Sequence, residues 1–408
     1  MNEGFETSFF KENRDRLRTL FTGTAPIVIS ANGLLQRNSD VNYPFRQDSS
    51  FWYLTGLDEP DLILVMDKGK DYIIAPERDE HRAAFDGAID YTHLIERSGV
   101  EAVLDDKTGW KQLGSRLKRV KHVATLAAAS AYVEQHGLYT NPARARLTER
   151  IQAHNSDIEL LDLRPHITRM RMIKQPAELD AIRQAIDITV EVLNKLQKKG
   201  FEKFQYEYEV EAAITASFKK ANVGHAYQPI VASGLNACTL HYVQNNDQIS
   251  ADNLILLDVG AEVSNYAADI TRTYAVNEPN HRQKQVFEAV VAAQEFAISK
   301  LKVGTNMRHY EEQMIQFMGE KLRELGLIKS IEDDTVRKYY PHATSHFLGL
   351  DVHDIADYDR PLEPGMVLTV EPGIYIPEEA IGIRLEDNIL ITAEGAEILS
   401  AKLPVVLS

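Results

Sequence analysis

The feature that most constrains this sequence is a series of apolar runs that each end on an acidic residue. The segment LILLDVG places Asp258 after four large aliphatic residues. Burying a carboxylate beside such a run is costly unless a charge or hydrogen bonds compensate it. The next apolar segment, YAADITRT, contains Asp269. If residues 258–269 form a hairpin, the two aspartates approach each other on adjacent strands, where close carboxylates require a shared proton or a cation.

Two further acids follow the same pattern. The segment VLTVEPG ends an apolar run on Glu371, and GIRLEDNIL places Arg384 and Glu386 on one face of a predicted strand. Simpler explanations exist for single members. One aspartate could form a turn while the other pairs with Arg272, and Arg384 with Glu386 could form a surface ion pair. Neither explains why Glu371 also interrupts a buried pattern.

Histidines are concentrated in the segment PHATSHFLGLDVHD, which contains His342, His346 and His353, although the whole chain has only 13. Neutral imidazole is the commonest nitrogen ligand of metals and a natural acid or base near neutral pH. Four carboxylates with at least one histidine predict a site for hard or borderline divalent ions, such as Mn²⁺, with Co²⁺ and Zn²⁺ also compatible. Four carboxylates exceed the need of one ion, so bridging between two ions is predicted.

A chain of 408 residues is longer than one hydrophobic core usually spans, so two domains are expected. The first, residues 1–168, is predicted to be an α/β layer domain. Residues 62–66 and 71–75 read as a hairpin around the turn KGK, and helical periodicity dominates residues 138–153.

The second domain, residues 169–408, is predicted to be α+β, with helices packed on an antiparallel sheet. Pro176 suits the first turn of a helix, and apolar residues repeat after it at helical spacing. The other predicted helices cover residues 206–221 and 281–301, and the predicted strands cover residues 253–259, 267–276, 366–370 and 382–391.

Composition excludes several classes of function. The net charge of −15 argues against general affinity for nucleic acid. The single cysteine, Cys238, forms no intrachain disulfide, the acidic N-terminus lacks the features of a signal peptide, and no apolar run reaches the length of a membrane helix. We therefore expect a cytoplasmic protein that binds neither nucleic acid nor membrane.

Five residues, in their order and sequence context, resemble the metal ligands of the pita-bread metallopeptidases: Asp258, Asp269, His346, Glu371 and Glu386. That family includes methionine aminopeptidase, prolidase and aminopeptidase P. The resemblance runs from about residue 174 to the C-terminus. The segments HFLGLDVHD, VEPGIY, and ASGLNA leading to His241 resemble the proline-specific branch.

The N-terminal segments RNSD, PFRQ and FWYLTG resemble the corresponding domain of bacterial aminopeptidase P. Methionine aminopeptidase lacks such a domain, and creatinase shares the two-domain fold without the metal ligands. The resemblance therefore implies a pita-bread catalytic domain after a smaller creatinase-like domain, which would serve substrate gating and oligomer contacts. Bacterial members often place a tryptophan of a neighbouring subunit over the substrate, and Phe85 is the nearest counterpart here.

By this resemblance, the chain removes the N-terminal residue from peptides whose second residue is proline, using two divalent ions, most commonly Mn²⁺. Asp269 and Glu386 would bridge the ions, His346 and Glu371 would complete one site, and Asp258 would chelate the other. Glu371 also resembles the family's proton shuttle, which protonates the poor leaving group.

The remaining site residues are also implied by the resemblance. His241, His342 and His353 would surround the ions as catalytic residues, and an imidazole could stabilise the developing oxyanion. The X–Pro bond has no N–H, so a pocket shaped for the pyrrolidine ring is required. The predicted substrate contacts are His342, Tyr375, Arg384 and Tyr227, with Asp40 of another subunit near the α-amine.

Two alternatives remain open from the sequence. A prolidase, which cleaves only Xaa-Pro dipeptides, would share every metal ligand. A non-catalytic pita-bread module that binds peptide or protein would typically have lost metal ligands, whereas none is lost here. A homodimer or homotetramer is expected from the resemblance alone.

Overall fold

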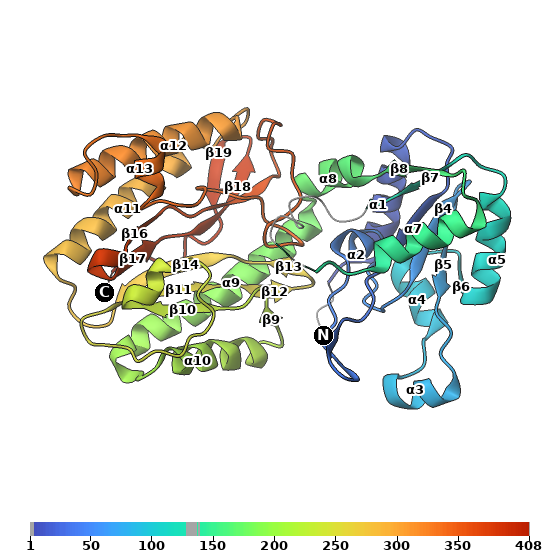
Figure 1. The fold of residues 1–408 in the computed structure, drawn as a ribbon, viewed down its shortest axis with the longest axis horizontal. Coiled ribbons are helices and arrows are strands. Elements are labelled where there is room, and N and C mark those ends of the chain that lie inside the picture. The colour runs from blue at the N-terminus through green and yellow to red at the C-terminus, as the bar shows by residue number, and fades with distance from the viewer. Residues whose placement is uncertain (1–3, 128–136, 138, 408) are drawn as a thin grey trace. The chain divides into compact units, whose positions relative to one another are not determined.

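The computed structural model describes residues 4–127, 137 and 139–407, and the chain forms two compact units, Met1–Met170 and Arg171–Ser408 (Figure 1). The division predicted from the sequence falls between residues 168 and 169, inside α8 (Arg164–Met172), which also contains the division between these units. Each unit combines helices with sheet, as predicted.

A six-stranded mixed sheet forms the centre of the N-terminal unit, in the order β6-β5-β4-β1-β7-β8. Its strands are β1 (Ile27–Ser30), β4 (Ile63–Asp67), β5 (Lys70–Ala75), β6 (Ala102–Asp105), β7 (His122–Thr125) and β8 (Glu159–Asp162). A separate hairpin consists of β2 (Gln36–Asn38) and β3 (Val41–Asn42). The helices before α8 are α1 (Thr7–Leu20), α2 (Ser49–Thr55), α3 (Glu80–Asp86), α4 (Tyr91–Ser98), α5 (Asp106–Leu117) and α7 (Ala143–His154).

The predicted hairpin of this unit is confirmed, because β4 and β5 pair in antiparallel fashion. Lys68 and Gly69 form its turn with φ of 53° and 77°, a left-handed conformation that glycine adopts at no steric cost. The predicted helix over residues 138–153 starts too early. In the structure α7 begins after Pro142, where the Asn141 side chain accepts a hydrogen bond from the Ala143 amide, and residue 138 lies outside the described residues.

The C-terminal unit contains small antiparallel sheets, in the orders β10-β11-β14, β13-β12-β9, β15-β18-β19 and β16-β17. The strands are β9 (Gly224–His225), β10 (Ile230–Ser233), β11 (Leu254–Val259), β12 (Ala261–Val263), β13 (Tyr266–Ala267), β14 (Ile270–Ala275), β15 (Val367–Val370), β16 (Gly373–Ile376), β17 (Ile381–Arg384), β18 (Asp387–Thr392) and β19 (Gly395–Ile398). The α-helices are α9 (Pro176–Lys199), α10 (Glu207–Lys220), α11 (His281–Lys300), α12 (Met307–Glu324) and α13 (Asp333–Arg337).

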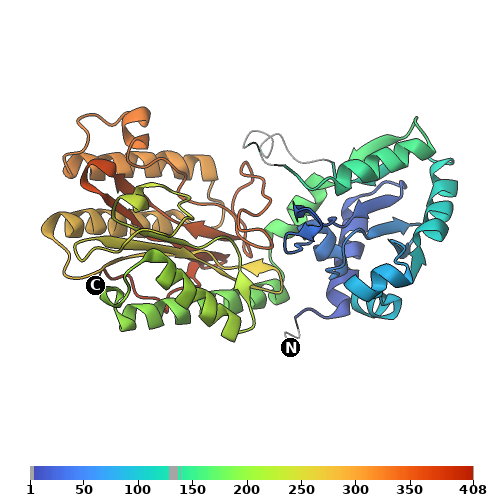
Figure 2. The ribbon, with the colours of Figure 1, turned by 60° about the horizontal axis from the view of Figure 1, so that its bottom comes forward.

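Helices cover these strands on two sides. In Figures 1 and 2, α9 and α10 lie on one side of the strands, and α11 and α12 lie on the other. The first pair packs on β9, β10, β12 and β13, whereas α11 packs on β15, β16 and β17. The predicted start of α9 is confirmed: Pro176 occupies its first turn, and the Glu178 side chain accepts a hydrogen bond from the Gln175 amide at 2.9 Å.

Two of the predicted strands are interrupted. The predicted strand over residues 267–276 divides into β13 and β14, with Asp269 in the gap, and that over residues 382–391 divides into β17 and β18, with Glu386 in the gap. The uninterrupted strands expected from the apolar pattern are therefore wrong at these two acids. Each gap removes an acidic residue from the regular alternation of side chains across a strand.

Candidate metal centre and active site

Asp258 ends the apolar part of β11, the central strand of its sheet. Its carboxylate lies 2.5 Å from the Tyr227 hydroxyl and forms an ion pair with Arg384, Nη2 to Oδ2, at 2.6 Å. Arg272 pairs instead with Asp387 at 2.7 Å. The alternative in which Arg272 neutralises an aspartate of the first pair is therefore wrong.

The two aspartates meet at one hydroxyl group. The Tyr227 oxygen is also 2.6 Å from Asp269 Oδ1, so its single proton can be donated to either carboxylate. Although Asp258 pairs with Thr271 in the strand register, the gap between β13 and β14 brings Asp269 close to it. The approach of the two aspartates predicted from the sequence is confirmed.

Asp269 and Glu386, the acids in the strand gaps, lie together with His346. One potential ligand atom of each lies within 4.8 Å of the others. Glu386 is held by the buried hydroxyl of Thr271, which donates to its Oε2 at 2.7 Å. Glu386 and Arg384 are only 2% and 4% exposed, so the surface ion pair considered from the sequence is wrong.

His346 connects this group to Glu371. Its Nε2 lies 3.3 Å from Asp269 Oδ2 and 3.4 Å from Glu371 Oε1. Its Nδ1 lies 3.0 Å from the carbonyl oxygen of Phe347, which assigns the proton of a neutral ring to Nδ1. Nε2 is then the nitrogen available to a cation, and all five predicted ligands belong to one connected cluster.

The electrostatics of the cluster favour a bound cation. Burial raises the pKa of Asp258, raises that of Glu371 to about 7 and raises that of Glu386 well above its usual range, and the charge of Asp269 adds to each shift. Burial opposes protonation of His346, but its hydrogen bond to Asp269 and the charge of Glu371 raise its pKa to about 9. These carboxylates resist ionisation because their negative charges are buried close together, and a divalent cation would offset that cost. Carboxylate oxygens with an imidazole nitrogen are a donor set suited to such ions.

A second group of residues surrounds His342. Its Nε2 lies 2.8 Å from the Tyr375 hydroxyl, which accepts a hydrogen bond from Arg384 Nη1 at 2.9 Å. Burial, reinforced by the charge of Arg384, lowers the pKa of His342 to about 3. Its ring packs edge-on against Tyr340 and Tyr375, with centroids 5.4 and 5.5 Å away. His342 therefore presents a neutral aromatic surface at neutral pH.

The other predicted catalytic histidines lie near His346 and His342. The His353 ring lies 4.1 Å from that of His346, and burial lowers the pKa of His353 to about 4. The exposed His241 lies close enough for its charge to lower the pKa of His342 and of His353.

Two predicted residues belong to the N-terminal unit. Asp40 lies exposed in the turn between β2 and β3, and Phe85 lies on α3 with 78% of its side chain exposed. Their predicted contacts belong to another subunit and stay predictions.

Three polar side chains of the centre were not identified from the sequence: Thr271, Thr369 and Asn388. All three are fully buried, and each lies two residues from a predicted metal ligand. Thr369 donates to Glu371 at 3.2 Å, and Asn388 accepts a hydrogen bond from the Asp269 amide at 3.2 Å. A polar residue two positions from an acid in an otherwise apolar strand is the signal that could have found them.

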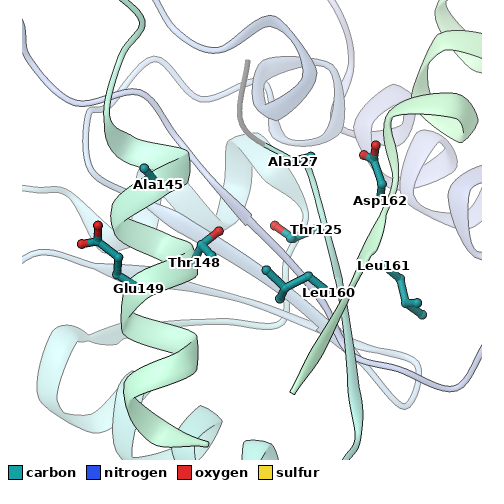
Figure 3. Close-up of a pocket in the computed structure, with 8 residues that line it drawn as sticks. All are labelled: Thr125, Ala127, Ala145, Thr148, Glu149, Leu160, Leu161 and Asp162. Carbon is teal, nitrogen blue, oxygen red and sulfur yellow. The ribbon is translucent and has the colours of Figure 1, made fainter. Parts of the chain in front are cut away.

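A pocket of about 330 Å³ in the N-terminal unit contains none of the predicted site residues (Figure 3). It lies between α7 and the strands β7 and β8, and both Thr148 of α7 and Leu160 of β8 line it. Asp162 at its edge accepts a hydrogen bond from Arg164 Nε at 2.8 Å. Among the described residues, the group of side chains that could hold a metal ion lies in the C-terminal unit instead.

Comparison with known families matches both units. Residues 180–393 match the model of metallopeptidase family M24, and residues 10–124 match that of the aminopeptidase P N-terminal domain.

Relatives match along nearly the whole chain. The chain is 34% identical to the Xaa-Pro aminopeptidase of Haemophilus influenzae, over 97% of this chain and 94% of that protein. It is 32% identical to the Xaa-Pro aminopeptidase of Escherichia coli, over 98% and 96%. The solved structure of E. coli aminopeptidase P with the inhibitor Pro-Leu superposes with a TM-score of 0.85 at 30% identity, covering 100% of this chain and 97% of that one.

Proposed function

This chain belongs to metallopeptidase family M24, and we propose that it removes the N-terminal residue from peptides whose second residue is proline. The observation that carries the proposal is the match to Xaa-Pro aminopeptidases along both units, supported by the group of Asp269, His346 and Glu386, which could hold a metal ion. The chain is a metal-dependent hydrolase.

We propose that two divalent ions, most commonly Mn²⁺, are held by the five clustered residues: Asp258, Asp269, His346, Glu371 and Glu386. Asp269 and Glu386, the acids in the strand gaps, would bridge the ions. Such ions polarise a carbonyl group and make water acidic enough to act as a nucleophile near neutral pH.

Glu371 is the proposed proton carrier. Burial raises its pKa to about 7 in the metal-free centre, so its carboxylate binds a proton more readily than an ordinary glutamate does. The carboxylate accepts a proton from the attacking water and returns it to the proline nitrogen, because a secondary amine leaves poorly unless it is protonated. The Thr369 hydroxyl, which donates to Glu371, holds this carboxylate in place.

Recognition of proline is assigned to the neutral aromatic surface of His342 and Tyr375. A peptide bond to proline has no N–H to recognise, so the flat ring surface must select the pyrrolidine ring by shape. The His241 and His353 imidazoles are proposed to lie near the developing oxyanion. The polar atoms of Tyr227 and Arg384 are already engaged with carboxylates, and their contact with substrate stays a prediction.

The test compares matched Xaa-Pro dipeptides and Xaa-Pro-Yaa tripeptides, with added Mn²⁺ and with chelator. Metal-dependent release of the first residue from the tripeptide is the expected result. Activity restricted to the dipeptide would assign a prolidase and overturn the substrate proposal. No activity on either, with metal bound, would favour the non-catalytic module.

Several finer features stay predictions: the identity of the ion, assembly into a homodimer or homotetramer, the cytoplasmic location, and substrate gating by the N-terminal unit. Among the described helices, none combines the length and the apolar character needed to cross a membrane.

A further inference from the structure

Glu207 is a fully buried acid at the start of α10, and among the described residues its side chain accepts hydrogen bonds from one neighbouring segment. Its Oε1 accepts from the Ser233 amide at 2.7 Å, the Ser233 hydroxyl at 3.0 Å and the Asn236 amide group at 3.1 Å. Its Oε2 accepts from the Tyr242 hydroxyl at 2.8 Å and the Asp247 amide at 3.0 Å. All of these donors lie within residues 233–247, which run from the last residue of β10 into its connection to β11.

The same segment carries His241. Within the described part of the chain, its imidazole makes no hydrogen bond, so its position depends on the backbone on either side. Tyr242 follows it directly and is tied to Glu207, while Ser233 and Asp247 anchor the segment before and after it. The segment also packs on β17, the strand that ends at Arg384: its short 3-10 helix, Gly234–Cys238, contacts this strand, and Cys238 Sγ donates to the Ile381 carbonyl oxygen at 3.4 Å. His241, three residues further along, lies within electrostatic range of His342 and His353.

We propose that Glu207 is a positioning residue that fixes the segment carrying His241 against β17, on the side of the molecule that holds the active site. The inference rests on the proposed peptidase function, in which His241 contacts the reacting peptide. The carboxylate is required because both of its oxygens receive donors. In glutamine, an NH₂ group replaces one of the two carboxylate oxygens. That group cannot accept hydrogen bonds, so the buried donors that face it would lose their acceptor.

The test uses Glu207→Gln, with Glu209→Gln as the matched control. Glu209 lies on the same helix, but its side chain accepts hydrogen bonds from the Gln205 and Tyr206 amides and not from residues 233–247. Hydrogen exchange of the Ser233 and Asp247 amides should become at least about tenfold faster in Glu207→Gln and remain unchanged in the control. This readout depends on neither metal nor activity.

The second measurement, of kcat/KM, tests whether Glu207 acts through His241. Glu207→Gln should lower kcat/KM on an Xaa-Pro-Yaa tripeptide by roughly tenfold, the loss expected for about one buried hydrogen bond. In a His241→Ala background, the same substitution should have no further effect on kcat/KM. An equal loss in both backgrounds would overturn the proposal, because Glu207 would then act on the fold and not through His241.

A milder variant decides the case if Glu207→Gln does not fold. Tyr242→Phe removes only the hydroxyl next to His241, and should lower kcat/KM in the same His241-dependent manner by a smaller factor. Unchanged amide exchange and unchanged kcat/KM in Tyr242→Phe would refute the positioning role. An inactive wild-type enzyme with the predicted exchange response would instead refute the proposed peptidase function.

Discussion

Thr271→Val should weaken metal binding without disturbing the fold, because it removes one hydroxyl and keeps the side-chain shape. Thr271 is fully buried on β14. Its Oγ1 donates to Glu386 Oε2 at 2.7 Å and accepts from Arg384 Nε at 3.1 Å. The valine variant therefore leaves a carboxylate oxygen and a guanidinium N–H of the metal centre without these partners.

The expected magnitude follows from the charged nature of both partners. A hydrogen bond to a charged group contributes about 1.5–3 kcal/mol to stability. Loss of a group that orients a metal ligand typically reduces metal affinity by about 10–100-fold, which corresponds to roughly 1.4–2.7 kcal/mol. The two ranges agree, so we expect a 10–100-fold increase in the Kd for Mn²⁺, with near-normal activity at saturating metal.

Isothermal titration calorimetry of the metal-free protein with Mn²⁺ measures this change, together with activity as a function of metal concentration. Thr273→Val is the matched control, because Thr273 is equally buried on the same strand but its hydroxyl is hydrogen-bonded to the backbone N–H and carbonyl oxygen of Arg384 instead of to Glu386. An unchanged Kd in Thr271→Val, or an equal loss in Thr273→Val, would refute the argument that the hydroxyl orients Glu386.

Three other predictions concern the same centre. Glu371→Ala should lower kcat by about 10²–10⁴-fold with the circular dichroism spectrum retained, and an active, metal-loaded variant would show that Glu371 is not the proton carrier. In chelator, the pKa values of Glu371 and His346, raised to about 7 and about 9, mean that the folded state holds these protons more tightly than the unfolded state does. Above about pH 6.5 the lowered pKa values of His342 and His353 no longer oppose this effect, because their imidazoles are then neutral in the unfolded chain as well, so Tm should fall as the pH rises from about 6.5 to 9. Excess Mn²⁺ should counteract this fall, so the difference in Tm between protein with Mn²⁺ and protein in chelator, measured by differential scanning fluorimetry, should widen with pH. A constant difference would contradict the proposal that Glu371 and His346 bind the ion. Gly260→Ala would place a Cβ 1.8 Å from the Ala268 carbonyl oxygen, next to Asp269, and should cost about 1–3 kcal/mol in urea denaturation, whereas Gly224→Ala, whose Cβ meets nothing within 4 Å, should be tolerated.

The fold class and the family were predictable because the relevant signals are local. The helix start at Pro176 and the hairpin of β4 and β5 follow from residue conformation and hydrophobic period. The helix α12 has no counterpart among the predicted elements, although its buried residues Tyr310, Met314 and Met318 repeat every four positions. That signal was present in the sequence and is typical of an amphipathic helix.

Strand continuity was predicted less well, for a physical reason. Apolar alternation continues through Leu385, which is fully buried, so the sequence gives no local sign of the gap at Glu386. The gap exists because Glu386 is held by Thr271 from another strand, through both a backbone and a side-chain hydrogen bond. Such contacts outweigh the local preference for continuous strand.

The chemistry of the centre can be read from the chain alone, since acids at the ends of aliphatic runs are too costly to bury without a compensating partner. Which groups provide that compensation depends on the folded arrangement. Thr271 and Glu386 are 115 positions apart in the sequence, and Glu207 is 26 positions from Ser233, yet each pair is hydrogen-bonded. Periodicity reports which face of a helix or strand is buried, but it carries no information about which distant element covers that face. The residue types of the proposed ligands were therefore evident from the sequence, whereas the hydrogen bonds that orient them arise only when the sheets and helices pack together.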